Sequence, residues 1–254
     1  MKHKFISLIP IAFVIIIWAV VSNNNVLPSY ILPSIKEVVS VYYKDAKILF
    51  DCMSTTVAES FIGLFLGAIL GLLFAIAMDC FNIVRLMLYP ILVITQSIPV
   101  VALAPLVILF FGYNMLPKIF LTSICCFFPV TVSTFNGFYS PSKQYFDLFK
   151  TMGASKFQIF KFIKLPFAVP YFVSGLKIAT TYAIISAIIS EWVGGDSGLG
   201  VYMIRAKNSY AFDKLFAVII LICIVSIAFV KLVDVINGIF LSKLNFNNLE
   251  KADV

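Results

Sequence analysis

The sequence predicts an all-α, polytopic membrane protein with six transmembrane helices. Hydrophobic residues make up 61% of the 254 residues and charged residues only 12%, and the mean hydropathy is +1.04. An ordinary soluble domain carries about 25% charged residues. One soluble domain of this size cannot hide so much apolar surface, so lipid must cover part of it. The apolar residues also gather in six stretches, each near the length of about 20 residues that spans a bilayer.

The six predicted spans follow one another along the whole chain. They are Phe5 to Val21, Thr56 to Met78, Leu86 to Phe111, Lys118 to Phe135, Pro170 to Val193 and Leu215 to Phe240. The first span follows a basic start, so a cleaved signal peptide is the alternative to a retained helix. Its end, Val20-Val21-Ser22 followed by three Asn, is a poor cleavage site, which favours the retained helix.

The basic residues predict orientation rather than a nucleic-acid surface. The net charge is +7, but the basic residues lie mostly between apolar runs and are not clustered with aromatic residues in a polar segment. The densest basic stretch, Lys143 to Lys164, holds five Lys and one acid, and such loops stay in the cytoplasm. A multi-pass protein of the inner (cytoplasmic) membrane with both termini in the cytoplasm follows from this assignment.

The predicted spans divide the chain into three parts. Residues 1–54 hold the N-terminal transmembrane helix and an outer interfacial segment, in which Pro33 to Phe50 forms a short amphipathic helix. Residues 55–241 form a five-helix core with a cytoplasmic loop at 138–169, and residues 242–254 form a cytoplasmic tail.

The cytoplasmic loop is predicted to form two short helices. The first ends at Gly153, because glycine readily takes the left-handed conformation that closes helices. The second starts at Ser155, whose hydroxyl caps it in a capping box with Gln158. Pro166 and Pro170 are expected to end this second helix. Lysines on one side and aromatic residues on the other suit either a helix on anionic lipid or a docking element for a partner protein.

The same loop resembles the EAA motif of ABC importer permeases, Glu-Ala-Ala-x3-Gly-x9-Ile-x-Leu-Pro. Four residues fall at the expected spacing: Gly153, Ile163, Leu165 and Pro166. Asp147 replaces the Glu, and the larger Leu148 and Phe149 replace the two Ala. The resemblance implies that this loop inserts between the lobes of an ABC ATPase subunit. It identifies the ATPase-coupling residues as Asp147, Met152, Gly153, Ala154, Ser155, Ile163, Leu165 and Pro166.

Similarity to the nitrate/sulfonate/taurine-type permease family extends from Leu32 through the last span. Stretches such as Thr95-Gln96-Ser97-Ile98-Pro99 and Ser190-Glu191-Trp192 carry it, and Phe127-Phe128-Pro129-Val130 is most similar to permeases for hydroxymethylpyrimidine, the thiamine precursor. The resemblance implies a type I, MetI-like importer core, a permease homodimer, ATPase subunits and an external substrate-binding protein. The small solute is then the pyrimidine precursor, or alternatively a sulfonate, taurine, nitrate or a riboflavin-like molecule.

The residues that could carry chemistry in this chain are few. No Gly-Lys dipeptide occurs, so a P-loop is absent from the sequence, and the single histidine is His3. We therefore predict no catalytic residue, no metal and no cofactor, with ATP hydrolysis on a partner subunit. The main competing class is a secondary carrier, which would show paired intramembrane charges and inverted repeats of broken helices. Neither is evident in the sequence; a membrane-embedded enzyme is disfavoured, since clustered acids or histidines are lacking.

The third span holds the predicted gate of the translocation pathway. Pro99 removes a helical hydrogen bond, which is tolerated at membrane depth only where protein or a water-lined cavity satisfies the freed group. Thr95, Gln96 and Ser97 come one turn before this break and are candidates to line the pathway. The alternative is a kinked helix whose polar groups bond to neighbouring helices.

Two residues of the fifth span complete the predicted pathway. Ionisable residues within membranes are costly and often functional, and Glu191 lies near the outer end of this span. It fits an outer gate or a docking rim for a binding protein, with a solvated loop end as the alternative. Ser186 is a weaker candidate, since Ser in membrane helices usually bonds to backbone. Lys177, near the cytoplasmic end, is expected to snorkel.

Overall fold

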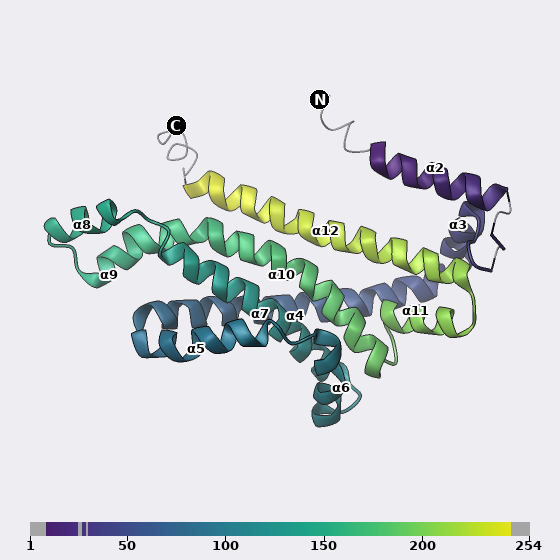
Figure 1. Cartoon of the computed structure of the whole chain (residues 1–254), viewed down its shortest axis with the longest axis horizontal. Coiled ribbons are helices and arrows are strands. Elements are labelled where there is room, and N and C mark those ends of the chain that lie inside the picture. Colours follow the sequence, from purple (N-terminus) through teal and green to yellow (C-terminus); the bar gives the residue numbers. More distant parts are fainter. Residues whose placement is uncertain (1–8, 25–26, 29, 245–254) are drawn as a thin grey trace.

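Long helices lying side by side form the body of the molecule (Figure 1), in a computed structural model that describes residues 9–24, 27–28 and 30–244. Within those residues every regular element is helical, which confirms the all-α prediction. The elements are α2 (Ile9–Asn23), α3 (Ile35–Lys44), α4 (Ala46–Cys80), α5 (Asn82–Thr95), α6 (Val100–Phe111), α7 (Met115–Phe138), α8 (Lys143–Thr151), α9 (Lys156–Ile159), a π-helical turn η1 (Phe160–Lys164), α10 (Leu165–Gly194), α11 (Leu199–Asn208) and α12 (Phe212–Leu244).

Four helical stretches are long and apolar enough to cross a membrane. They are Ala46–Cys80, Met115–Phe138, Lys156–Gly194 and Phe212–Val235, and α5 with α6 makes a fifth if this bent pair is one span. The described part of the first predicted span, α2, is apolar but shorter than a span, and residues 1–8 lie outside the described structure. The count of six therefore stays a prediction. So does the division of the chain at residue 54, through which α4 runs unbroken.

The third predicted span is two helices rather than one kinked helix. The axes of α5 and α6 differ by 106°, and the chain turns between Thr95 and Val100. Pro99 causes this break, because it lacks a backbone N–H and restricts the residue before it. Pro90 and Pro105 lie inside α5 and α6 without ending them. Of the three prolines expected to interrupt the span, only Pro99 therefore does so.

Helices α4, α7 and α10 form the centre of the bundle, where a row of glycines lets α4 approach α7. Gly63, Gly67 and Gly71 are spaced four residues apart and share one face of α4. A Cβ on Gly63 would lie 2.5 Å from the Thr122 side chain, and one on Gly67 would lie 2.6 Å from the Ser123 carbonyl oxygen. Small residues at such spacing allow close helix packing in membranes, so the stripe sets the distance between these two helices.

At one end of the long helices, α3 and α11 pack over the start of α12. Val38 and Val41 of α3 are buried in a cluster with Leu199 of α11 and Val218 of α12. The predicted amphipathic helix at Pro33 to Phe50 is thus α3 followed by the start of α4, and its apolar side faces protein. The cytoplasmic loop predicted from the sequence lies at the opposite end of the bundle (Figure 1).

Candidate coupling and translocation site

The loop between α7 and α10 forms a coupling elbow, defined here as residues 143–164. Its first helix, α8, is followed by Gly153 with φ +76°, and the Gly153 and Ala154 N–H groups donate to the Lys150 and Phe149 carbonyls. The second helix begins with a capping box: Ser155 Oγ accepts from the Gln158 N–H, and Gln158 Oε1 accepts from the Ser155 N–H at 2.7 Å. The predicted helix stop and cap are confirmed.

The second helix of the elbow does not end at the two prolines. It passes through the π-helical turn η1 directly into α10, which reaches Gly194. Pro166 sits in the first turn of α10 and Pro170 lies inside that helix. Because the chain is already helical before Pro166, we attribute its tolerance to the wider π-helical turn η1 directly before it. The expected stop at Pro166 and Pro170 was wrong, so the elbow is joined to a membrane span without a flexible break.

The two helices of the elbow present their side chains to the outside. No residue of α8 or α9 is buried, and the apolar side chains of Met152 and Phe157 are 74% and 71% exposed. Asp147, Gly153 and Ser155 lie on the same exposed part. Exposed apolar groups of this kind mark a surface that a partner protein or the lipid interface covers, which are the two alternatives given by the sequence.

The remaining predicted coupling residues form the root of the elbow. Ile163 is 2% exposed, and Leu165 and Pro166 begin α10. The ring of Phe160 also packs on that of Phe138, with centroids 5.5 Å apart. The eight predicted residues therefore separate into an exposed tip, which includes the half-buried Ala154, and a root at the start of α10, where Ile163 is buried and Leu165 is exposed.

The predicted gate residues lie at the bend between α5 and α6. Gln96, Ser97 and Pro99 are exposed, and Thr95 is half-buried with its hydroxyl donating to the Ile91 carbonyl at 2.8 Å. Ser186 is buried on α10, and its hydroxyl donates to the Tyr182 carbonyl at 2.7 Å. Within the described residues no hydrogen bond joins the bend to Ser186 or Glu191, but Val100, directly after Pro99, packs against the apolar cluster that contains Ile189 of α10.

Glu191 is enclosed at the end of the bundle opposite the elbow. Its Oε1 accepts from the Thr56 hydroxyl at 2.6 Å, and its Oε2 accepts from the Gly200 N–H at 2.6 Å. The Leu199 N–H in turn donates to Thr56 Oγ1 at 2.8 Å. Since the residue is only 1% exposed, the alternative of a solvated loop end is wrong. Glu191 instead ties together α4, α10 and α11.

Gly198 completes the cage around Glu191, defined as Thr56, Gly198, Leu199 and Gly200. Its backbone has φ +123° and ψ 166°, a region that residues with a side chain rarely adopt. A Cβ at this position would overlap the Glu191 carboxyl group. Glycine is therefore required both by the backbone angle and by the close approach of the carboxylate.

A second buried acid lies one turn away from Thr56 on α4. Glu59 Oε1 accepts from Lys118 Nζ of α7 at 2.8 Å, and the two side chains are 1% and 7% exposed. Glu59 Oε2 has no hydrogen-bond partner among the described residues. The sequence singled out Glu59 as a charged residue within a predicted span, because it interrupts an otherwise apolar stretch. Its partner was missed, because Lys118 was assigned to the outer end of a span.

Paired charges within the spans are thus present, contrary to the sequence-based expectation. Lys177 of α10, expected to snorkel, also pairs with Asp234 of α12 at 2.5 Å, with both side chains about half exposed. Secondary carriers also hold paired intramembrane charges and broken helices, so the choice between a carrier and an importer subunit needs information independent of these features.

A polar cavity of about 190 Å³ adjoins the Glu59–Lys118 pair. Its lining residues come from α4, from the start of α7 and from the turn after α10: Thr55, Glu59, Tyr113, Asn114, Met115, Lys118, Gly194, Asp196 and Ser197. A few convergent polar groups in a cavity are typical of a small-molecule site. This cavity and Glu191 mark the end of the bundle opposite the elbow as the second part of the candidate site.

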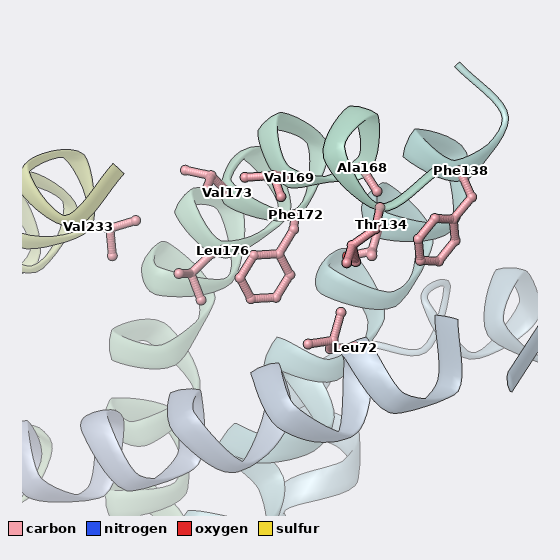
Figure 2. A pocket seen from close by; sticks show the side chains of 10 residues that line it. Leu72, Thr134, Phe138, Ala168, Val169, Phe172, Val173, Leu176 and Val233 are labelled. Atoms are coloured by element: carbon pink, nitrogen blue, oxygen red, sulfur yellow. The ribbon is translucent and has the colours of Figure 1, made fainter. Parts of the chain in front are cut away.

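The cavity of about 260 Å³ shown in Figure 2 has a different character. It lies near the root of the elbow, between α4, α7, α10 and α12, with Leu72, Phe172 and Val233 among its lining residues. The only polar side chain there, Thr134, donates its hydroxyl to the Val130 carbonyl. No side chain in this apolar cavity is left to orient a polar solute, so we do not assign it to solute recognition.

Comparison with known proteins supplies the independent information. Residues 63–245 match the family described as binding-protein-dependent transport system inner membrane component. A probable ABC transporter permease protein of Haemophilus influenzae is 36% identical over 228 residues, covering 89% of this chain and 93% of the relative. The formylaminopyrimidine transport permease protein ThiX of Halalkalibacterium halodurans is 36% identical over 231 residues, covering 89% and 92%.

The fold is also shared with a solved transporter. The crystal structure of an amino acid ABC transporter with histidines matches with a TM-score of 0.66 at 16% identity, over 77% of this chain and 95% of the other. At that identity the likeness concerns the fold alone. It agrees with the MetI-like core that the sequence resemblance implies.

Proposed function

This chain belongs to the binding-protein-dependent transport system inner membrane component family, and on that premise we propose its solute, its docking surface and its way of working. It is the membrane-spanning permease subunit of an ATP-driven importer. The family implies an ATPase subunit and a substrate-binding protein as partners. The solute proposed is a pyrimidine precursor of thiamine, supported by 36% identity to a formylaminopyrimidine permease over nearly its full length.

We further propose that the coupling elbow docks on the ATPase subunit. The supporting observation is the exposed tip, where Gly153 turns the chain and Met152 and Phe157 stand free of the bundle. An apolar tip among lysines fits a groove on a partner protein. This docking places the elbow and both termini in the cytoplasm, and Glu191 near the outer surface. A homodimer of this chain completes the proposed membrane unit.

In the proposed transport cycle, ATP-driven closure of the ATPase pair displaces the elbow. Because η1 continues into α10 without a break, the displacement reaches the bundle as a rotation of α10. The bend at Thr95 to Pro99 then opens the pathway, and the cage around Glu191 separates at the outer end to admit solute from the binding protein. The bundle acts as packed helices that shift together, which is the usual form of such transitions.

The solute assignment is tested by uptake into proteoliposomes that contain the permease, its ATPase and its binding protein. We expect ATP-dependent uptake of radiolabelled hydroxymethylpyrimidine, and no uptake of radiolabelled taurine at the same concentration. Vesicles without the ATPase serve as the control. Preferred uptake of taurine would refute the pyrimidine assignment, and uptake driven by an ion gradient without ATPase would refute the importer mechanism.

A further inference from the structure

Beside the root of the elbow, side chains from four elements form a polar joint, defined as Asp79 of α4, Arg85 of α5, Tyr139 at the end of α7 and Lys164 of η1. Lys164 Nζ lies 2.6 Å from Asp79 Oδ1, and the two side chains are 19% and 4% exposed. Separating a largely buried ion pair leaves an uncompensated charge, so the pair resists opening. A displacement of η1 is therefore passed to the end of α4.

Tyr139 extends the joint to α5. Its ring centroid lies 5.2 Å from Lys164 Nζ and 5.9 Å from the guanidinium carbon of Arg85. Arg85 Nη1 also donates to the Tyr139 hydroxyl at 3.3 Å. Cations near an aromatic face are attracted by the ring quadrupole. The ring thereby connects the lysine at the root of the elbow with an arginine on the helix that leads to the bend.

Helix α5 connects the joint with the bend between α5 and α6. Arg85 lies near its first turn and Thr95 is its last residue, a separation of about 15 Å at about 1.5 Å per residue. The rings of Tyr89 and Phe135 pack α5 against α7 at the same end, with centroids 6.0 Å apart. Pro90 lies between Arg85 and Thr95 without ending α5, so a rotation imposed at Arg85 is carried along one helix to the predicted gate.

The other contacts of the root are less suited to transmit a movement. Ile163 and Phe160 are held by apolar packing, which has no preferred direction. The ion pair and the hydrogen bond have fixed partners. We propose that Asp79, Tyr139 and Arg85 are positioning residues, which carry the displacement of Lys164 into α4 and α5 and so couple ATP hydrolysis to opening of the bend. This inference rests on the proposed docking of the ATPase at the elbow.

The test is the Asp79→Asn variant in the complete complex with its ATPase and binding protein. We expect the amount of labelled hydroxymethylpyrimidine moved per ATP hydrolysed to fall about tenfold, within the usual range of coupling between linked sites. The amount of ATPase bound and the rate of ATP hydrolysis should be unchanged. The exchanged pair Asp79→Lys with Lys164→Asp should restore most of the ratio. The control is Asp234→Asn, which removes the half-exposed ion pair with Lys177, outside both the joint and the elbow.

An unchanged ratio of transport to hydrolysis in Asp79→Asn would overturn the inference. If Asp79→Asn does not insert into the membrane, the Tyr139 variants provide the test. The inference then requires that Tyr139→Leu transport less solute per ATP hydrolysed than the parent, and that Tyr139→Phe, which keeps the ring, lose less of this ratio. Equal ratios in both Tyr139 variants and the parent would reject it. A pull-down separates this result from a failure of the proposed function, since a parent chain that binds no ATPase would refute the docking itself.

Discussion

Lys118 of α7 and Glu59 of α4 form a buried ion pair, with Lys118 Nζ donating to Glu59 Oε1 at 2.8 Å. The pair joins two helices whose backbones are brought together by the Gly63, Gly67 and Gly71 stripe. Thr56, three residues before Glu59, holds Glu191 by a hydrogen bond. The two acids consequently connect α4, α7, α10 and α11 at the end opposite the elbow, and the first two predictions concern this connection.

Removing one partner of the buried pair should destabilise the protein severely. Glu59→Gln removes the carboxylate that pairs directly with the buried Lys118 ammonium, for which we expect a loss of about 3–5 kcal/mol. The measurement is denaturant unfolding of the purified protein in detergent. Lys177→Met is the matched control, because the Lys177–Asp234 pair is half exposed and such pairs contribute about 0–1 kcal/mol. The double variant Glu59→Gln with Lys118→Met should be more stable than Glu59→Gln alone. Equal losses of stability in Glu59→Gln, in the double variant and in Lys177→Met would contradict the role of the buried pair.

Replacing Gly198 by alanine should disrupt the cage around Glu191. Gly198 and Gly112 have similar backbone angles, with φ +123° and +79° and ψ near 180°, so alanine strains both by about 1–3 kcal/mol. Of these two glycines, Gly198 is the one whose added Cβ would meet the Glu191 carboxyl, whereas nothing lies within 4 Å of a Cβ on Gly112. Gly198→Ala should therefore cost about 1–3 kcal/mol more than Gly112→Ala in the same unfolding measurement. Equal costs would show that the carboxylate moves aside freely.

The left-handed turn at Gly153 should be required for coupling. A Cβ at Gly153 meets nothing within 4 Å, so a substitution acts through the backbone angle or at the docked partner. Gly153→Val, whose branched side chain disfavours φ +76°, should lower ATP-dependent uptake by about tenfold or more, a range typical of coupling. Gly153→Asn, of similar size, tolerates this angle and should retain most of the uptake. Equal loss in both variants would point to side-chain bulk at the docking surface instead.

The cluster around Asp45 should weaken in acid. A hydrogen bond from Lys214 and then one from Tyr202 hold the pKa of the Asp45 carboxyl below its usual value of 3.8. A lowered folded-state pKa stabilises the folded protein fully above the unfolded value, and this contribution is lost as pH falls through the folded pKa. Asp45→Asn should thus lower stability at neutral pH by about 1 kcal/mol, and the difference from the parent should vanish in strong acid. Unfolding curves of the parent and of Asp45→Asn at several pH values measure this difference in stability. A difference that does not change with pH would contradict the lowered pKa of Asp45.

Several features follow from the sequence because they depend on neighbours along the chain. Composition alone requires a membrane, and the Gly153 stop and the Ser155–Gln158 capping box involve residues within one turn of each other. The spacing of Gly153, Ile163, Leu165 and Pro166 identifies the family, which the comparisons confirm. These signals are local, so no knowledge of the packing is needed to interpret them.

Other features were decided only by the tertiary structure. Glu59 and Lys118 are far apart in sequence, and a helix that is apolar on most sides carries no periodicity that shows which face meets a neighbour. The same holds for Lys164, whose partners Asp79 and Tyr139 come from different helices. Whether a proline breaks a span also depends on what surrounds the freed backbone groups, so Pro99 separates two helices while Pro170 lies within one. Burial makes an unpaired charge or carbonyl costly, and only the packed bundle determines which partner satisfies it.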